Sequence, residues 1–251
     1  MELLELTAYL SAGIAAGVVN TLAGGGSIFT LSLLLFMGVP APLANGTNRL
    51  GILVQNISGA YTFHRSGLLN VKQSLIFIIP SLLGALTGAY IATDISTEHM
   101  EDIVGALMVF MLFSILIKPS TGNKRIQTLG QDLFRWYFIP LFYAIGFYGG
   151  FVQAGIGILI IVSLSLSASM PLIRSNAIKM LIIALYSLPV VLIFVFQGQI
   201  LWLAAILLAI GQLSGTWITN RYLTKIEGID KWIKWIMIVM ISITIVKTFF
   251  L

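Results

Sequence analysis

Long runs of uncharged, apolar residues constrain this chain more than any other feature of its sequence. Three of them, 76–93, 181–198 and 201–220, approach the roughly 20 residues that a helix needs to cross the ~30 Å hydrocarbon core of a bilayer. Such runs exclude a β-barrel, whose strands would alternate apolar and polar residues. Since 58% of the residues are hydrophobic and only 9% are charged, we predict an all-α polytopic integral membrane protein.

The hydrophobic residues group into ten predicted segments, of which the second and seventh are short. The segments span 3–23, 26–38, 43–63, 72–93, 100–117, 134–150, 154–168, 172–195, 200–220 and 232–250. The two short segments either cross the bilayer or re-enter with their neighbours, which predicts eight to ten membrane segments.

The two halves of the chain resemble each other weakly. A shift of 130 residues places Arg49 on Lys179, and a shift of 127 places "GALTGAYI" (84–91) on "GQLSGTWI" (211–218), although small residues four apart could also match by composition alone. Five segments per half is an odd number, so the second half must be inverted in the membrane relative to the first. The predicted units are a first repeat at 1–117, a cytoplasmic linker at 118–135 and an inverted repeat at 136–251.

Charge predicts how the chain lies in the cytoplasmic (inner) membrane. Loops 65–72, 118–135 and 221–234 are basic, whereas loop 94–102 is acidic. The positive-inside rule places the basic loops in the cytoplasm and both termini on the outer side. The same rule explains the net charge of +5, so no nucleic-acid partner is expected. The chain begins Met-Glu-Leu-Leu-Glu, without the basic start of a cleaved signal, and we expect the first segment to be retained.

Glycines interrupt the chain at matching positions in the two halves, in "NTLAGGGSIFT" (20–30) and "GGFVQAGIGIL" (149–159). A broken helix leaves unpaired backbone N–H groups and a positive dipole end, which attract anions. Paired breaks in inverted repeats indicate the binding site of a transporter. The alternative is that the glycines only allow close helix packing. The predicted helix-break glycines are Gly24, Gly25, Gly26, Gly155 and Gly157.

The segment after each break carries polar residues on one helical face. The spacing i, i+4, i+11 joins Asn45, Arg49 and Asn56, and it recurs 130 residues later. One cation from each half, with amide and hydroxyl donors, would suit an anion with several oxygens. Alternatively, Arg49 could extend to the lipid headgroups, because it lies only about two turns into its helix. The predicted substrate-binding residues are Asn45, Thr47, Asn48, Arg49, Gln55, Asn56, Gln153, Ser175, Asn176, Lys179 and Tyr186.

The sequence contains no pattern typical of a metal centre or an intramembrane enzyme. Neither histidine has a partner at metal-ligand spacing, cysteine is absent, and no Ser/His or paired-Asp arrangement lies at membrane depth. We therefore expect no metal, no cofactor and no enzymatic activity. The expected partners are a small anion, the lipid bilayer and a coupling ion, either a proton or sodium, and His64 is a weak candidate for proton coupling. The alternative function is a channel for small oxyanions or carboxylates.

Two ordered motifs resemble the TauE/SafE family, also called the sulfite exporter or TSUP family. "NTLAGGGSIFTLSLLL" followed by "PAPLANGTNRLG" is similar to its first glycine motif and short helix, and "GFYGGFVQAGIG" (146–157) to its second. Ser32 and Ala154 stand where many members have proline, and Arg49 replaces the commoner lysine. The resemblance implies a secondary transporter, expected to export sulfur-containing anions such as sulfite, sulfoacetate or other organosulfonates by alternating access. It does not determine the substrate.

Overall fold

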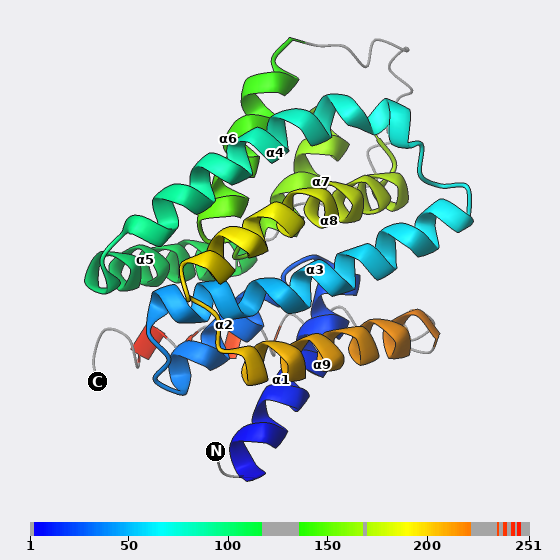
Figure 1. The fold of residues 1–251 in the computed structure, drawn as a ribbon. Coiled ribbons are helices and arrows are strands. Elements are labelled where there is room, and N and C mark those ends of the chain that lie inside the picture. The colour runs from blue at the N-terminus through cyan, green and yellow to red at the C-terminus, as the bar shows by residue number, and fades with distance from the viewer. Residues whose placement is uncertain are drawn as a thin grey trace.

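The computed structural model describes residues 3–116, 136–167 and 170–221 and single positions between 235 and 246, and within them it contains helices and no strands (Figure 1). The helices are α1 (Leu3–Ala23), α2 (Gly26–Phe36), α3 (Ala41–Arg65), α4 (Val71–Asp94), α5 (Thr97–Leu116), α6 (Phe138–Phe151), α7 (Ile156–Ser167), α8 (Leu172–Phe196) and α9 (Trp202–Arg221). They match the first nine predicted segments to within a few residues. The tenth predicted segment and the linker at 118–135 lie outside the described ranges.

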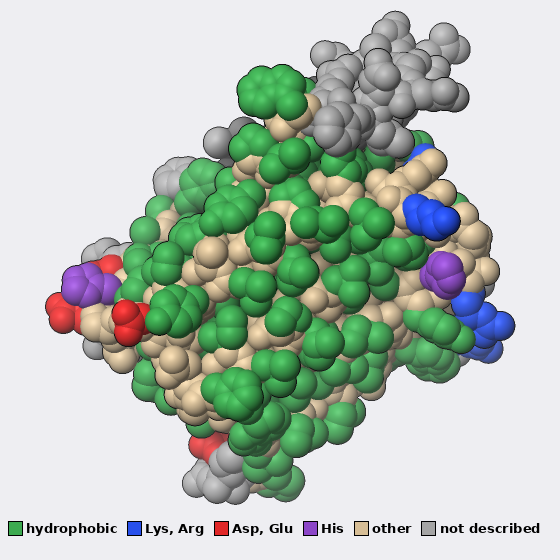
Figure 2. Space-filling model, turned by 45° about the horizontal axis from the view of Figure 1, so that its top comes forward, with side chains coloured by type: hydrophobic (Ala, Val, Ile, Leu, Met, Phe, Trp, Pro, Cys, Tyr) green, Lys and Arg blue, Asp and Glu red, His purple; other side chains and the backbone are tan. Residues whose placement is uncertain are grey.

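Three helices in the described ranges, α4, α8 and the 202–219 part of α9, are long and apolar enough to cross a membrane. Between its charged ends the visible surface is covered mainly by hydrophobic side chains (Figure 2). The predicted all-α, multi-pass membrane protein is therefore confirmed. With 11 and 12 residues, α2 and α7 are about 16–18 Å long and span only half of a hydrocarbon core.

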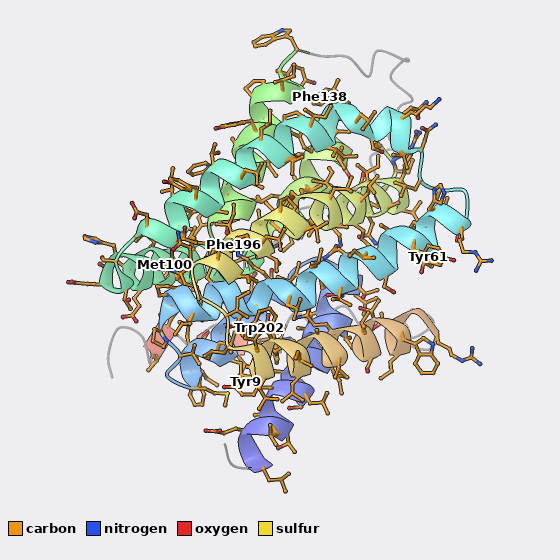
Figure 3. All side chains as sticks on the ribbon, viewed as in Figure 1. Tyr9, Tyr61, Met100, Phe138, Phe196 and Trp202 are labelled. Atoms are coloured by element: carbon orange, nitrogen blue, oxygen red, sulfur yellow. The ribbon has the colours of Figure 1, made fainter. Side chains whose placement is uncertain are left out.

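Charged side chains collect at opposite ends of the molecule. Figure 2 shows Lys and Arg at one end of this face and most Asp and Glu at the other. The basic end is formed by the end of α3, the starts of α4 and α8 and the end of α9, and the acidic end by the end of α4 and the start of α5. In Figure 3, Tyr61 near the end of α3 lies on the right of the molecule, whereas Met100 of α5 and Phe196 of α8 lie further to the left. This polarity agrees with the predicted orientation, which itself stays a prediction.

The helices pair crosswise between the two halves. Helix α1 packs on α9 and α6 packs on α4, each pair running parallel, whereas α3 and α8 pack antiparallel. Because α4 ends at the acidic end and α9 at the basic end, their partners α6 and α1 enter from opposite ends. Two repeats of opposite orientation can pack in this way, and the division of the chain at 1–117, 118–135 and 136–251 stays a prediction.

Matching pairs of glycines make the crosswise contacts close. The contact between α1 and α9 uses Gly13 and Gly17 facing Gly211 and Gly215, and that between α4 and α6 uses Gly84 and Gly88 facing Gly146 and Gly150. At each of these positions a Cβ atom would lie against a backbone atom of the opposite helix. Within a bilayer such small residues stabilise helix pairs by allowing close packing. Gly84 and Gly88, which the sequence shift of 127 places on Gly211 and Gly215, therefore lie in equivalent helix contacts of the two halves.

Replacing Gly150 by alanine is expected to destabilise the protein by about 2 kcal/mol or more. The new Cβ would overlap the carbonyl oxygen of Ala85, a backbone atom that cannot turn away. The midpoint of thermal unfolding in detergent should fall. Ala144→Leu, on the exposed face of the same helix, is the control and should leave the midpoint unchanged. An unchanged midpoint for Gly150→Ala would contradict a close contact at this point.

Candidate functional site

The two predicted helix breaks lie against each other. The first break (Gly24–Gly25) separates α1 from α2, and the second break (152–155) separates α6 from α7. A Cβ on Gly24 would lie 3.2 Å from the carbonyl carbon of Gly157. The Ser27 hydroxyl donates to the Gln153 carbonyl at 3.0 Å and accepts from the Gly155 N–H at 3.1 Å. The breaks of the two halves therefore form one buried junction.

Backbone conformation explains the glycines at this junction. Gly24 and Gly155 have φ values of +75° and +67°, a region that side chains other than glycine rarely adopt. Gly25 precedes the first turn of α2, and Gly26 packs against the carbonyl of Ala16. At Gly157, a Cβ would lie 2.6 Å from the Gly24 carbonyl oxygen. These glycines therefore serve both to turn the chain and to permit close contact.

Gln153 is the one described non-glycine residue with a positive φ, at 63°. The conformation costs of the order of 1 kcal/mol and persists only where surrounding contacts hold it. Those contacts are buried: its amide donates to the Ser187 hydroxyl at 3.1 Å and the Tyr186 hydroxyl at 3.4 Å, and its side-chain oxygen accepts from Arg49 at 3.5 Å. Gln153 thus links α3 and α8 through the second break.

Arg49 is fully buried and binds the last carbonyl groups of α6. Its Nη1 donates to Gly149 O at 3.2 Å, and its Nη2 donates to Gly150 O at 2.6 Å and to Phe151 O at 3.1 Å. A cation at this position neutralises the negative end of the helix dipole and satisfies carbonyls that have no helical partner. Complete burial excludes the lipid-headgroup alternative for Arg49.

Two neighbours complete the surroundings of Arg49. Asn45 accepts from Arg49 Nη2 at 3.1 Å and donates to Phe151 O at 2.7 Å. The guanidinium lies over the Phe194 ring of α8, 4.2 Å from its centroid. Of the predicted substrate-binding residues, the structure therefore gathers Asn45, Arg49, Gln153 and Tyr186 around the end of α6.

Asn48 ties α3 to the first break. Its amide donates to the Ser27 carbonyl at 3.2 Å, and its side-chain oxygen accepts from the Thr30 hydroxyl. All three side chains are buried, and α2 is thereby held against α3.

Lys179 has surroundings unlike those of its counterpart Arg49. It is fully buried, and its Nζ makes no hydrogen bond to any described residue. Its side chain passes the start of α7, where its Cδ lies 3.2 Å from the position that a Cβ on Gly157 would take. No Asp or Glu among the described residues is buried. A buried charge is costly unless it is paired, and the described residues supply no acceptor for an ammonium at this position.

The remaining predicted residues lie apart from the junction. Gln55 joins a separate network: it accepts from Asn20 at 3.0 Å and donates to Thr216 at 2.8 Å and to the Gly17 carbonyl at 3.2 Å. This network ties α3 to α1 and α9, and every polar atom of the Gln55 side chain has a protein partner there.

Four more predicted residues make hydrogen bonds away from the Arg49 side chain or have no described partner for their side-chain oxygen. Thr47 accepts from the Leu201 N–H at 3.0 Å and so fixes the start of α9, and Ser175 pairs with Ser165 of α7 at 3.2 Å. Asn56 donates to its own helix at Ile52 O. The side-chain oxygens of Asn56 and Asn176 are buried without a described hydrogen-bond partner.

The sequence reading did not include several residues that the structure brings to these contacts. They are Asn20, Ser27, Thr30, Ser187, Phe194 and Thr216. Ser27 could have been chosen, because it is a hydroxyl directly after the three glycines of the first break. The others contact residues distant in sequence, and no local pattern marks them.

Comparisons with known proteins give the family of this chain and several relatives. The family described as "Sulfite exporter TauE/SafE" matches residues 9–248. The chain is 27% identical over 212 residues to "Probable membrane transporter protein ORF9" of Sinorhizobium sp, covering 84% of this chain and 80% of that protein. It is 28% identical over 222 residues to "Probable membrane transporter protein YunE" of Bacillus subtilis, covering 79% and 81%. "Probable membrane transporter protein YfcA" of Escherichia coli is 23% identical over 210 residues, covering 82% and 76%.

No solved structure matches the chain. The family match covers nearly the whole sequence, including both helix breaks and both buried cations. The chain therefore belongs to the TauE/SafE family of membrane transporters.

Proposed function

We propose that this protein is a secondary transporter that exports small sulfur-containing anions, such as sulfite, sulfoacetate or other organosulfonates, across the cytoplasmic membrane. The observation that carries the proposal is the buried ammonium of Lys179, unpaired among the described residues and lying beside the junction of two broken helices. The sulfur chemistry is supported by the description of the family, which names a sulfite exporter.

The anion would lie between Lys179 and the backbone of the two breaks. Helix α7 begins at Ile156, beside the Lys179 side chain. The N–H of Ile158 donates to Gly155 O at 3.0 Å, whereas those of Ile156 and Gly157 have no partner within the helix. N–H groups of this kind bind oxyanions, and a neighbouring ammonium adds a charge-assisted hydrogen bond. Arg49 would act differently, by holding the end of α6 in place while Gln153, Tyr186 and Asn45 shape the junction.

The crosswise pairing supports a movement between two repeats, 1–117 and 136–251, that opens the junction to one side at a time. With loops 65–72, 118–135 and 221–234 in the cytoplasm, the basic end would attract anions from inside the cell. Arg49 would release the carbonyls of α6 in one state and bind them in the other, which gives the two states different contacts. A proton gradient, a sodium gradient or the substrate gradient would drive the cycle.

Transport by purified protein in liposomes tests the proposal. Uptake of radiolabelled sulfite should saturate with concentration and fall when an unlabelled sulfonate is added, whereas protein-free liposomes should show neither effect. An anion channel would instead give unitary currents in a planar bilayer. The side chains of Arg49 and Lys179 are inaccessible to solvent in this conformation, which favours a carrier over an open pore. Absence of any saturable anion flux would contradict the transporter assignment.

A further inference from the structure

We infer that the anion site beside Lys179 opens toward the basic end of the molecule in this conformation, and that contacts of α3 keep it closed toward the acidic end. The inference rests on the proposed anion site and adds the end from which an anion reaches it. It is carried by a difference between the contacts of α3 and those of α8, the helices that hold Arg49 and Lys179.

The two helices approach the junction from opposite ends. Helix α8 begins at the basic end, and α3, which packs antiparallel to it, begins toward the acidic end. Arg49 and Lys179 each lie about two turns into their helix. The residues that precede Arg49 therefore separate the junction from the acidic end, and those that precede Lys179 separate it from the basic end.

Toward the acidic end, α3 is bound first to the end of α6. Asn45 donates to Phe151 O at 2.7 Å and accepts from Arg49 Nη2 at 3.1 Å, and the same nitrogen donates to Gly150 O at 2.6 Å. Hydrogen bonds from a guanidinium are stronger than bonds between neutral groups. Separating α3 from α6 would break several of these bonds together.

The same part of α3 is also bound to the connection between α8 and α9. The Thr47 hydroxyl accepts from the Leu201 N–H at 3.0 Å. Gly46 lies so close to Gln199 that a Cβ atom would be 2.0 Å from the Gln199 carbonyl oxygen. The Gln199 side chain donates in turn to Thr93 O, at the end of α4, at 3.2 Å. Helices α3, α4, α8 and α9 are thereby joined at the acidic end.

The corresponding positions of α8 do not make these contacts. A shift of 130 residues replaces Asn45, Gly46, Thr47 and Arg49 of α3 by Ser175, Asn176, Ala177 and Lys179 of α8. Ala177 has no hydroxyl group, the side-chain oxygen of Asn176 has no described partner, and Lys179 donates to no carbonyl of the described residues. The Ser175 hydroxyl pairs with Ser165 of α7, in the same half of the chain, at 3.2 Å. The contacts that close the acidic end therefore have no counterpart of the same kind at the basic end.

Two contacts between the start of α8 and the first half of the chain are of a weaker kind. Arg174 donates to Gln73 of α4 in an exposed position, where water competes for the bond. Met180 packs on Gly59 of α3 with a flexible side chain. Opening at the basic end would therefore break fewer and weaker bonds among the described residues than opening at the acidic end. Local opening follows the lowest cost in free energy, so an anion would reach the site from the basic end.

A thiol placed at the junction measures which end admits an anion. The chain contains no cysteine, so a single introduced cysteine reacts without background. Ile156→Cys, at the start of α7, places a buried thiol at the junction. Lys179→Cys is a second reporter at the same place and keeps the test decisive if the first variant does not fold.

The reagent is 2-sulfonatoethyl methanethiosulfonate, an anionic sulfonate that modifies thiols and does not cross membranes. It is added to right-side-out and to inside-out vesicles that contain the full-length protein. Ser66→Cys and Ser96→Cys, exposed at the basic and the acidic end respectively, identify the end that faces the reagent in each preparation.

We expect Ile156→Cys to be modified at least ~10-fold faster from the basic end than from the acidic end, a ratio that corresponds to about one hydrogen bond. Adding Thr47→Val, which removes the acceptor for the Leu201 N–H, should raise the rate from the acidic end several-fold. Thr62→Val is the matched control in the same helix, because the Thr62 hydroxyl is exposed and bonds to its own helix. It should leave both rates unchanged.

Equal rates from the two ends, a faster rate from the acidic end, or no modification from either end would overturn the inference. An unchanged rate from the acidic end in the Thr47→Val variant would overturn the role assigned to α3. Saturating methanesulfonate should slow the modification of Ile156→Cys several-fold, because it would occupy the site beside the thiol. If methanesulfonate has no effect, the anion site of the proposed function fails, whereas a faster rate from the basic end would still identify the end that opens.

Discussion

Replacing Arg49 by methionine is expected to cost the protein about 3 kcal/mol of stability or more. The substitution leaves the carbonyls of Gly149 and Gly150 without the Arg49 donors that now bind them, whereas Phe151 O keeps its bond from Asn45. Each buried polar group that loses its partner costs roughly 1–3 kcal/mol. The midpoint of thermal unfolding in detergent should fall by many degrees, and the region 149–153 should become sensitive to proteases.

The loss should depend on the geometry of the guanidinium as well as on its charge. Arg49→Lys keeps the charge but has one point of attachment in place of a fork, so it should lie between wild type and Arg49→Met. Arg65→Met, at the exposed end of α3, is the control and should have little effect. If Arg49→Met were as stable as wild type, the contacts to α6 would not be what holds the second break closed.

The helices could be predicted from the sequence because a bilayer tolerates so few alternatives. A membrane segment must satisfy its own backbone hydrogen bonds and remain apolar, and both demands are visible locally. The eighth segment was expected at 172–195 and is found at Leu172–Phe196. The third was expected at 43–63 and is found at Ala41–Arg65, because Ala41 and Pro42 form the first turn of the helix and the polar residues His64 and Arg65 continue its last turn.

The contacts within the site could not be predicted in the same way. Spacing placed Arg49 and Lys179 at equivalent positions and suggested equal roles, since a sequence shows which residues share a helical face. It does not show what the facing helix presents to them. The end of α6 is carbonyl-rich and faces Arg49, whereas Lys179 meets the start of α7, which offers N–H groups and no described acceptor. Gln55 was expected at the site but instead forms hydrogen bonds with Asn20 and Thr216, residues of the facing helices α1 and α9 that the spacing in α3 does not reveal.

That asymmetry leads to the second large effect, at Lys179. Replacing Lys179 by methionine is expected to abolish anion binding, with at least ~100-fold loss of affinity, and to raise the stability of the anion-free protein by about 1 kcal/mol or more. Methionine fills nearly the same space with a flexible apolar chain and removes a buried charge that has no described partner. Thermal unfolding with and without methanesulfonate measures both effects.

The expected changes in stability have opposite signs, a loss for Arg49→Met and a gain for Lys179→Met. This difference distinguishes a structural role for Arg49 from a binding role for Lys179. Lys179→Arg restores the charge and should recover part of the anion-dependent stabilisation, whereas Lys179→Met should unfold at the same temperature with and without methanesulfonate. If Lys179→Met bound methanesulfonate like wild type, the anion site would lie elsewhere. A destabilised Lys179→Met would show that the ammonium has a protein partner, and its role would then resemble that of Arg49. Stability gained with binding lost is the result that only an unpaired, ligand-binding cation would give.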